Sequence, residues 1–118
     1  MQTHTGKYCE LKEGCLLVHA PKELDHHEAA QMREETDRMI AACHVRQLVF
    51  DFSRTEFMDS SGIGVIIGRC RTMGYCGGEV FAQNLSGRLQ KIFTVSGLHK
   101  LVRTNRPEME NVQKGNEI

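Results

Sequence analysis

Two adjacent serines stand where a phosphate could be attached. Residues 59–64 read Asp-Ser-Ser-Gly-Ile-Gly, and they lie between an apolar segment at 45–52 and another at 63–73. If the first segment is a strand and the second a helix, the hydroxyls fall at a helix N-terminus. Free N–H groups and the positive end of the helix dipole favour an anion there. The pattern therefore indicates that Ser60 can be switched by phosphorylation.

The same position also suits an ordinary helix cap. A serine hydroxyl that caps a helix stabilises it by about 1 kcal/mol and needs no kinase. On the residues alone, the cap is the interpretation that we favour for Ser60.

Enzymatic and metal sites have weaker support. Ser60, with His26 or His27 and Asp25, supplies the residue types of a hydrolase triad, but the serine lacks the Gly-x-Ser-x-Gly turn that exposes such a nucleophile. The adjacent His26 and His27 diverge by about 100° on a helix, so they cannot chelate one ion as an i, i+4 pair does. We expect no enzyme activity, no metal and no cofactor.

The glycines of this region do not form a phosphate-binding fingerprint. Gly62, Gly64 and Gly68 have the wrong spacing for a dinucleotide motif, and no Gly-Lys-Ser/Thr follows. Gly64 and Gly68 lie four residues apart on one helical face. This spacing predicts close helix packing or the close approach of a partner's backbone.

The surrounding pattern predicts one α/β domain, with a small mixed sheet packed against helices in the order β-β-α-β-α-β-α and a short final edge strand. Asp25, followed by Glu28, resembles a capping box before an apolar stripe that runs to Cys43. Ser86 and Gly97 are expected to cap the two ends of the last helix. Strands are expected at 8–11, 15–20, 45–52 and 79–83, a middle helix at 63–73 and the edge segment at 98–104.

The composition excludes several classes of partner. The chain has 118 residues and a formal net charge of zero, so nucleic acid and anionic membranes are poor candidates. No apolar window is long enough to cross a membrane, and the five cysteines are odd in number without a Cys-x-x-Cys pair. We expect a soluble cytoplasmic protein with reduced thiols, a domain at 1–104 and a disordered polar tail at 105–118.

Several motifs resemble one protein family. Residues 57–69 closely resemble a segment of the bacterial anti-sigma factor antagonists of the STAS domain family. Residues 23–27, Glu-Leu-Asp-His-His, are similar to the motif that opens the first helix in its sporulation members, although Lys22 stands where the family usually has glycine. The segments 78–79 and 93–98 fit as well, and the resemblance spans about residues 7–104.

The resemblance implies a STAS-type domain that works by partner switching. Unphosphorylated, it would bind a serine kinase that is also an anti-sigma factor, which frees the sigma factor. The kinase, which binds the ATP, would phosphorylate Ser60, and a serine phosphatase would reverse this. The kinase-binding surface would include Asp25, Asp59, Ser61, Gly62, Ile63 and Gly64.

Two alternatives stay open. One is an antagonist of the general stress type, which would keep the mechanism and act on a different sigma factor. The other is a STAS module that binds a nucleotide or another ligand without a kinase cycle.

Electrostatics predicts where the phosphate acts. It adds about −1.5 to −2 charge at pH 7. The helix N-terminus favours this anion by roughly 0.3–1 kcal/mol, whereas Asp59 repels it by on the order of 1 kcal/mol. Because the two effects roughly cancel, we expect phosphorylation to leave the fold unchanged and to act at the interface with the kinase.

Overall fold

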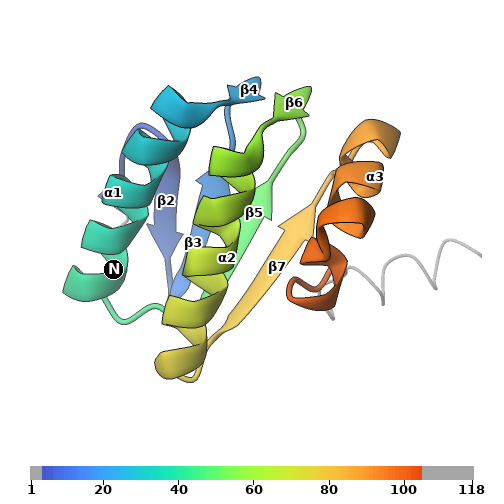
Figure 1. The fold of residues 1–118 in the computed structure, drawn as a ribbon. Coiled ribbons are helices and arrows are strands. Elements are labelled where there is room, and N and C mark those ends of the chain that lie inside the picture. The colour runs from blue at the N-terminus through green and yellow to red at the C-terminus, as the bar shows by residue number, and fades with distance from the viewer. Residues whose placement is uncertain (1–3, 105–118) are drawn as a thin grey trace, which may run out of the picture.

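The chain forms a mixed β-sheet with helices packed against it (Figure 1). The computed structural model describes residues 4–104. The strands lie in the order β1-β2-β3-β5-β7, antiparallel from β1 to β3 and parallel from β3 to β7. The predicted α/β class and mixed sheet are confirmed. The strands are β1 (His4–Thr5), β2 (Cys9–Lys12), β3 (Cys15–His19), β5 (Gln47–Asp51) and β7 (Glu79–Gln83).

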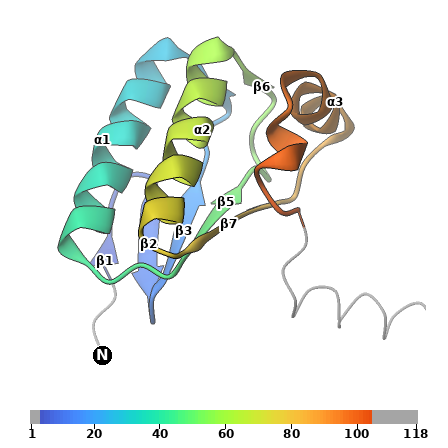
Figure 2. The same ribbon diagram turned by 60° about the horizontal axis from the view of Figure 1, so that its bottom comes forward.

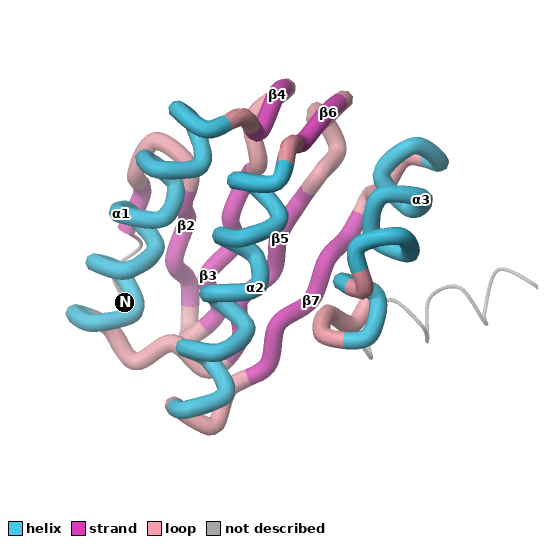
Figure 3. Tube along the Cα trace, viewed as in Figure 1, coloured by secondary structure: helices cyan, strands magenta, loops and turns pink. Residues whose placement is uncertain are grey.

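Three helices accompany the sheet. They are α1 (His26–Ala42), α2 (Ser60–Tyr75) and α3 (Gly87–Ser96). Figures 1 and 2 show α1 and α2 side by side on one face of the sheet, with α3 next to β7. Parallel strands need a crossover connection, and α1 and α2 supply it for the pairs β3/β5 and β5/β7. Short loops join most of these elements (Figure 3).

Strand β5 is the centre of the core. Leu48, Val49 and Phe50 are fully buried, so both faces of this strand are covered, as expected for a central parallel strand. The aromatic core continues through Phe52, which meets Phe93 of α3 edge to face with ring centroids 5.6 Å apart. The core therefore holds α3 near the C-terminal end of β5. The chain leaves β5 at this same end on its way to α2.

The apolar stripe predicted for α1 is confirmed, with one addition. Ala29, Met32 and Thr36 are buried, and the charged residues at 33, 34, 37 and 38 are exposed. Glu35 is also buried, which the stripe did not predict. A buried carboxylate needs hydrogen-bond donors, so its partners matter for stability.

Glu35 ties the first strands to α1. Its carboxylate accepts backbone N–H bonds from Lys7, Tyr8 and Cys9 at 3.0, 2.9 and 2.7 Å. Burial by itself raises the pKa of Glu35, but these bonds, with the Cys9 side chain, outweigh burial and hold the pKa below its ordinary value. The ionised carboxylate is thus the form that the fold stabilises.

A buried arginine joins α1 to α2. Arg69 of α2 forms an ion pair with Asp37 and donates to the hydroxyl of Thr36 at 3.1 Å. Its Nε has no hydrogen-bond partner among the described residues. The two helices are therefore held by a directional contact midway along their length as well as by apolar packing.

A second, two-stranded sheet was not predicted. β4 (Glu23–Leu24) pairs in parallel with β6 (Phe57–Met58), directly before α1 and α2. In Figure 1 this pair lies at the same end of the molecule as the N-termini of both helices. Strands of two residues carry no periodic pattern, so they form because the tertiary structure brings them together.

The last described residues differ in detail from the expected edge strand. Leu98–Lys100 forms a 3-10 turn, η1, and Arg103 makes a single parallel bridge to Phe81 of β7. Gly97 adopts the left-handed conformation expected at the helix end, and the fully buried Leu98 then anchors the chain before it reaches β7. The predicted tail, 105–118, lies outside the described residues, so the boundary at 104 stays a prediction.

Candidate functional site

The small sheet brings the two sequence motifs together. Leu24 of β4 pairs with Met58 of β6, and the N–H of Asp59 donates to the carbonyl of Leu24 at 3.3 Å. Asp25 and Asp59 each follow a member of this pair, and each precedes a helix. The N-termini of the two helices therefore lie side by side, although Asp25 and Asp59 are 34 residues apart in the sequence (59 − 25).

Both aspartates are N-caps. Asp25 accepts the N–H of Glu28 at 3.0 Å, as the predicted cap requires. Asp59 accepts the N–H groups of Ser61 and Gly62 at 2.8 and 3.3 Å. The interpretation of Ser60 as the cap is therefore wrong: Asp59, in the extended conformation, takes that position and α2 begins at Ser60.

Ser60 is exposed at the first position of α2. Within residues 4–104 its hydroxyl makes no hydrogen bond, because Asp59 satisfies the amides that a capping serine would reach. The hydroxyl is thus available to solvent and to a partner.

Ser61 has a different environment. It is half-buried, and its Oγ lies 3.2 Å from Nδ1 of His26 on α1. His27 turns the other way, to Gln31, with the two side-chain nitrogens 2.9 Å apart. The two histidines thus diverge as predicted, and His26 links the start of α1 to the start of α2.

The glycines of α2 serve two purposes. Gly62 is buried, and a Cβ there would lie 2.9 Å from the carbonyl oxygen of Leu24, so this position allows close approach of β4. At Gly64 and Gly68 a Cβ would meet nothing within 4 Å. Close helix packing, one of the two explanations offered for this pair, is therefore wrong, because both positions face open space.

A groove runs from the paired N-termini between α1 and α2. Its volume is about 300 Å³, and it carries one cationic side chain, Arg33, that forms no ion pair with another described residue. Beside the serines, the aromatic side chain of Phe57 is 46% exposed. Sequence reasoning missed both residues. The groove is lined by His26, Ala29, Ala30, Arg33, Ser61, Gly64 and Val65.

All the predicted site residues fall at this end of the molecule. Asp25 and Asp59 cap the helices, Gly62 packs inside, Ile63 is half-buried, and Gly64 is exposed. Comparison with known proteins gives this arrangement its family. A model of the STAS domain matches residues 9–112.

The chain belongs to the STAS domain family. The anti-sigma F factor antagonist of Paenibacillus polymyxa is 33% identical over 93 residues, which are 79% of this chain and 80% of that protein. Unphosphorylated SpoIIAA, an anti-sigma factor antagonist, has a TM-score of 0.68 at 26% identity and covers 99% of this chain and 98% of its own. Phosphorylated SpoIIAA, described as a Bacillus cell fate determinant, has a TM-score of 0.67 at 28% identity, with 96% of each chain covered. The family predicted from the sequence, that of the STAS anti-sigma factor antagonists, is confirmed.

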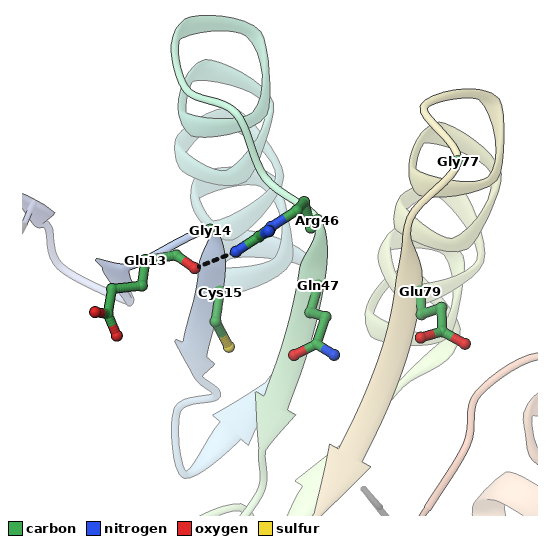
Figure 4. Close-up of a pocket in the computed structure, with 7 residues that line it drawn as sticks. All are labelled: Glu13, Gly14, Cys15, Arg46, Gln47, Gly77 and Glu79. Atoms are coloured by element: carbon green, nitrogen blue, oxygen red, sulfur yellow. Dashed lines mark hydrogen bonds between the residues drawn. The ribbon is translucent and has the colours of Figure 1, made fainter.

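The STAS domain has a second pocket, larger than the groove between α1 and α2, at the end of the parallel strands that lies away from the serines (Figure 4). Its volume is about 560 Å³, and its cation, Arg46, donates to the backbone carbonyl of Glu13 at 3.0 Å. A Cβ on Gly14, which has a positive φ, would lie 2.7 Å from the Arg46 guanidinium. Arg46 thus supports the β2–β3 turn, and this pocket contains none of the residues predicted for the site.

Residues 4–104 contain neither a candidate membrane span nor a candidate metal centre. No helix there has the length and hydropathy needed to cross a bilayer. No group of three or more His, Cys, Asp or Glu side chains is arranged to hold a metal ion.

Proposed function

We propose that this STAS domain is an anti-sigma factor antagonist that is inactivated by phosphorylation of Ser60. In the unphosphorylated form it binds a serine kinase that also acts as an anti-sigma factor, and the sigma factor is released. A serine phosphatase restores the active form. The antagonist names of the relatives, and the phosphorylated and unphosphorylated forms of SpoIIAA, support this proposal.

The exposed Ser60 hydroxyl is the observation that carries it. During transfer, Oγ forms a bond to the γ-phosphorus of ATP on the kinase, the bond to the bridging oxygen breaks, and ADP leaves. The hydroxyl proton goes to a base of the kinase. The STAS domain is therefore substrate and ligand in this cycle, and the kinase is the catalyst.

The cap explains why the phosphate acts at the interface. The N–H groups of Ser61 and Gly62 are the natural anion-binding groups of α2, but Asp59 already holds them. A phosphate on Ser60 cannot displace that carboxylate without losing the cap, so it stays in solvent beside a like charge. Binding would then require both groups to be desolvated against the kinase. The nearly equal TM-scores to the two forms of SpoIIAA, 0.68 and 0.67, agree with a fold that tolerates the phosphate.

The partner surface extends along α2. Gly64 and Gly68 leave its face without side chains, although glycine costs a helix about 1 kcal/mol relative to alanine. Because no residue within 4–104 requires these glycines, we assign the open face to the kinase, whose backbone can approach closely there. Phe57 supplies an exposed aromatic contact at the edge of the same surface.

The proposal includes a cytoplasmic location. Cys9, Cys43, Cys70 and Cys76 are free thiols, which fits a reducing compartment. The sigma factor is proposed to be of the sigma F type, as the name of the Paenibacillus relative, anti-sigma F factor antagonist, suggests. A kinase of the general stress type would keep the mechanism and change the sigma factor.

Mass spectrometry tests the proposal. The protein is incubated with ATP and the anti-sigma factor kinase of the same organism, and trypsin, which cuts after Arg54 and Arg69, releases the peptide 55–69. We expect one phosphate, on Ser60. Its absence, or its position on Ser61, would refute the proposal.

Binding measurements give the second half of the test. Ser60→Ala should bind the kinase as tightly as the unmodified protein and resist inactivation. Ser60→Asp should bind at least about tenfold more weakly, which corresponds to about 1.4 kcal/mol. Equal affinity of the phosphorylated and unphosphorylated proteins would show that the modification is not the switch.

A further inference from the structure

We propose that His26 selects Ser60 over Ser61 as the phosphate acceptor, by holding the Ser61 hydroxyl against α1. This inference rests on the proposed function, in which a kinase meets two adjacent serines at the start of α2. Sequence alone does not distinguish the hydroxyls, since both belong to the same Asp-Ser-Ser-Gly segment.

The helix turns the two serines in different directions. Consecutive residues of an α-helix diverge by about 100°, so when Ser60 faces solvent, Ser61 faces the neighbouring helix. The structure has this arrangement: Ser60 is exposed, and Ser61 is half-buried in the wall of the groove between α1 and α2. The backbone N–H of Ser61 is also fixed, by its bond to Asp59 at 2.8 Å.

His26 adds a bond to the hydroxyl itself. Its Nδ1 lies 3.2 Å from Oγ of Ser61, and it follows Asp25, which fixes the start of α1. The bond therefore joins the first turns of two helices, each of which is capped by an aspartate. Within residues 4–104, the Ser60 hydroxyl has no comparable partner.

Phosphoryl transfer to Ser61 would have to break this bond. The Oγ must lie in line with the γ-phosphorus of ATP, its proton must pass to a base of the kinase, and ADP must leave. Held against His26, the Ser61 hydroxyl would have to leave this bond before its Oγ could align with the γ-phosphorus. A hydrogen bond of ordinary net strength corresponds to about a fivefold change in an equilibrium or a rate.

His27 offers a matched control. It lies next to His26 in the same helical turn and is likewise exposed, but it bonds to Gln31 instead of a serine. Replacing either histidine removes one imidazole from the start of α1. Only the replacement of His26 frees the Ser61 hydroxyl.

The test uses the Ser60→Ala protein, in which Ser61 is the one serine left in the segment. Four chains are incubated with the anti-sigma factor kinase and ATP: Ser60→Ala alone, and the same chain with His26→Ala, His27→Ala or His26→Asn. Phosphate on Ser61 is measured in the tryptic peptide 55–69, and thermal unfolding confirms that each chain is folded.

We expect His26→Ala to raise phosphorylation of Ser61 by about fivefold or more over Ser60→Ala alone. His27→Ala should not raise it. His26→Asn, whose amide nitrogen can take the place of Nδ1, should keep Ser61 protected, which a purely structural role of the imidazole ring would not predict.

The results separate this inference from the proposed function. Phosphate on Ser60 of the unmodified chain, without any gain at Ser61 in the His26→Ala chain, would overturn the inference and leave the function standing. An equal gain with His27→Ala would also overturn it, because loosening of α1 would then explain the result. If the unmodified chain takes no phosphate on Ser60, the proposed function fails first, and the inference fails with it.

Discussion

Gly64→Ala is expected to stabilise the free protein and weaken its complex with the kinase. Alanine is favoured over glycine inside a helix by about 0.8–1.0 kcal/mol. At Gly64 the added Cβ would meet nothing within 4 Å, so no clash offsets this gain. For a domain of this size, about 1 kcal/mol corresponds to a rise in Tm of roughly 3–6 °C.

Two other glycines of α2 provide control substitutions for Gly64→Ala. Gly74 is equally open but lies in the last turn, far from the paired N-termini, so Gly74→Ala should stabilise the protein and leave kinase binding unchanged. Gly62→Ala should destabilise it by about 1–3 kcal/mol, because the new Cβ would lie 2.9 Å from atoms of Leu24. The three substitutions are chemically identical and differ only in what surrounds them.

Thermal unfolding and titration calorimetry measure the two effects separately. If the backbone of the kinase contacts the open face of α2, Gly64→Ala should weaken binding about tenfold or more, whereas Gly74→Ala should not. Equal affinity of these two variants would refute the assignment of the open face to the partner. A loss of stability in Gly64→Ala would instead refute the description of that face as open.

Three further predictions concern stability and contact. Glu35→Gln should lower the free energy of unfolding by about 1.5–3 kcal/mol, measured in urea, because a neutral amide replaces the charged acceptor of three N–H bonds. Since the pKa of Glu35 is lowered by folding, its contribution is complete above its unfolded pKa of about 4.3 and is lost as the pH falls through the folded value. Urea curves of the two proteins should therefore converge in strong acid, and a constant difference down to low pH would contradict this. Phe57→Ser should change stability by less than about 1 kcal/mol but weaken kinase binding about tenfold or more, by calorimetry, and unchanged affinity would exclude Phe57 from the interface.

The periodic elements were predictable from the sequence. The apolar stripe of α1, the cap at Asp25 and the strand at 79–83 all follow local rules, and each is where the pattern indicates. Gly97 ends α3 in the left-handed conformation for the same reason. These features depend on a few neighbouring residues, which is why one sequence suffices.

The features that were missed depend on contacts between distant residues. The pairing of β4 with β6 involves two residues on each side, too few for a pattern. The burial of Glu35 follows from the N–H groups of Tyr8 and Cys9 at the start of β2, which no spacing on α1 reveals. The cap of α2 was assigned to Ser60 because serine and aspartate are almost equally good caps, and only the backbone geometry separates them.

The β4–β6 pair sets a limit on how this protein can vary. Because Leu24 is matched to Met58, a slip of this pairing by one residue would shift one aspartate cap relative to the other by about 3.3 Å. A partner that touches both helix ends could not follow such a shift with a rigid surface. We therefore expect proteins that share this partner to keep each aspartate directly after its strand, and to vary at exposed positions of the preceding segments, such as Lys22 and Ser53.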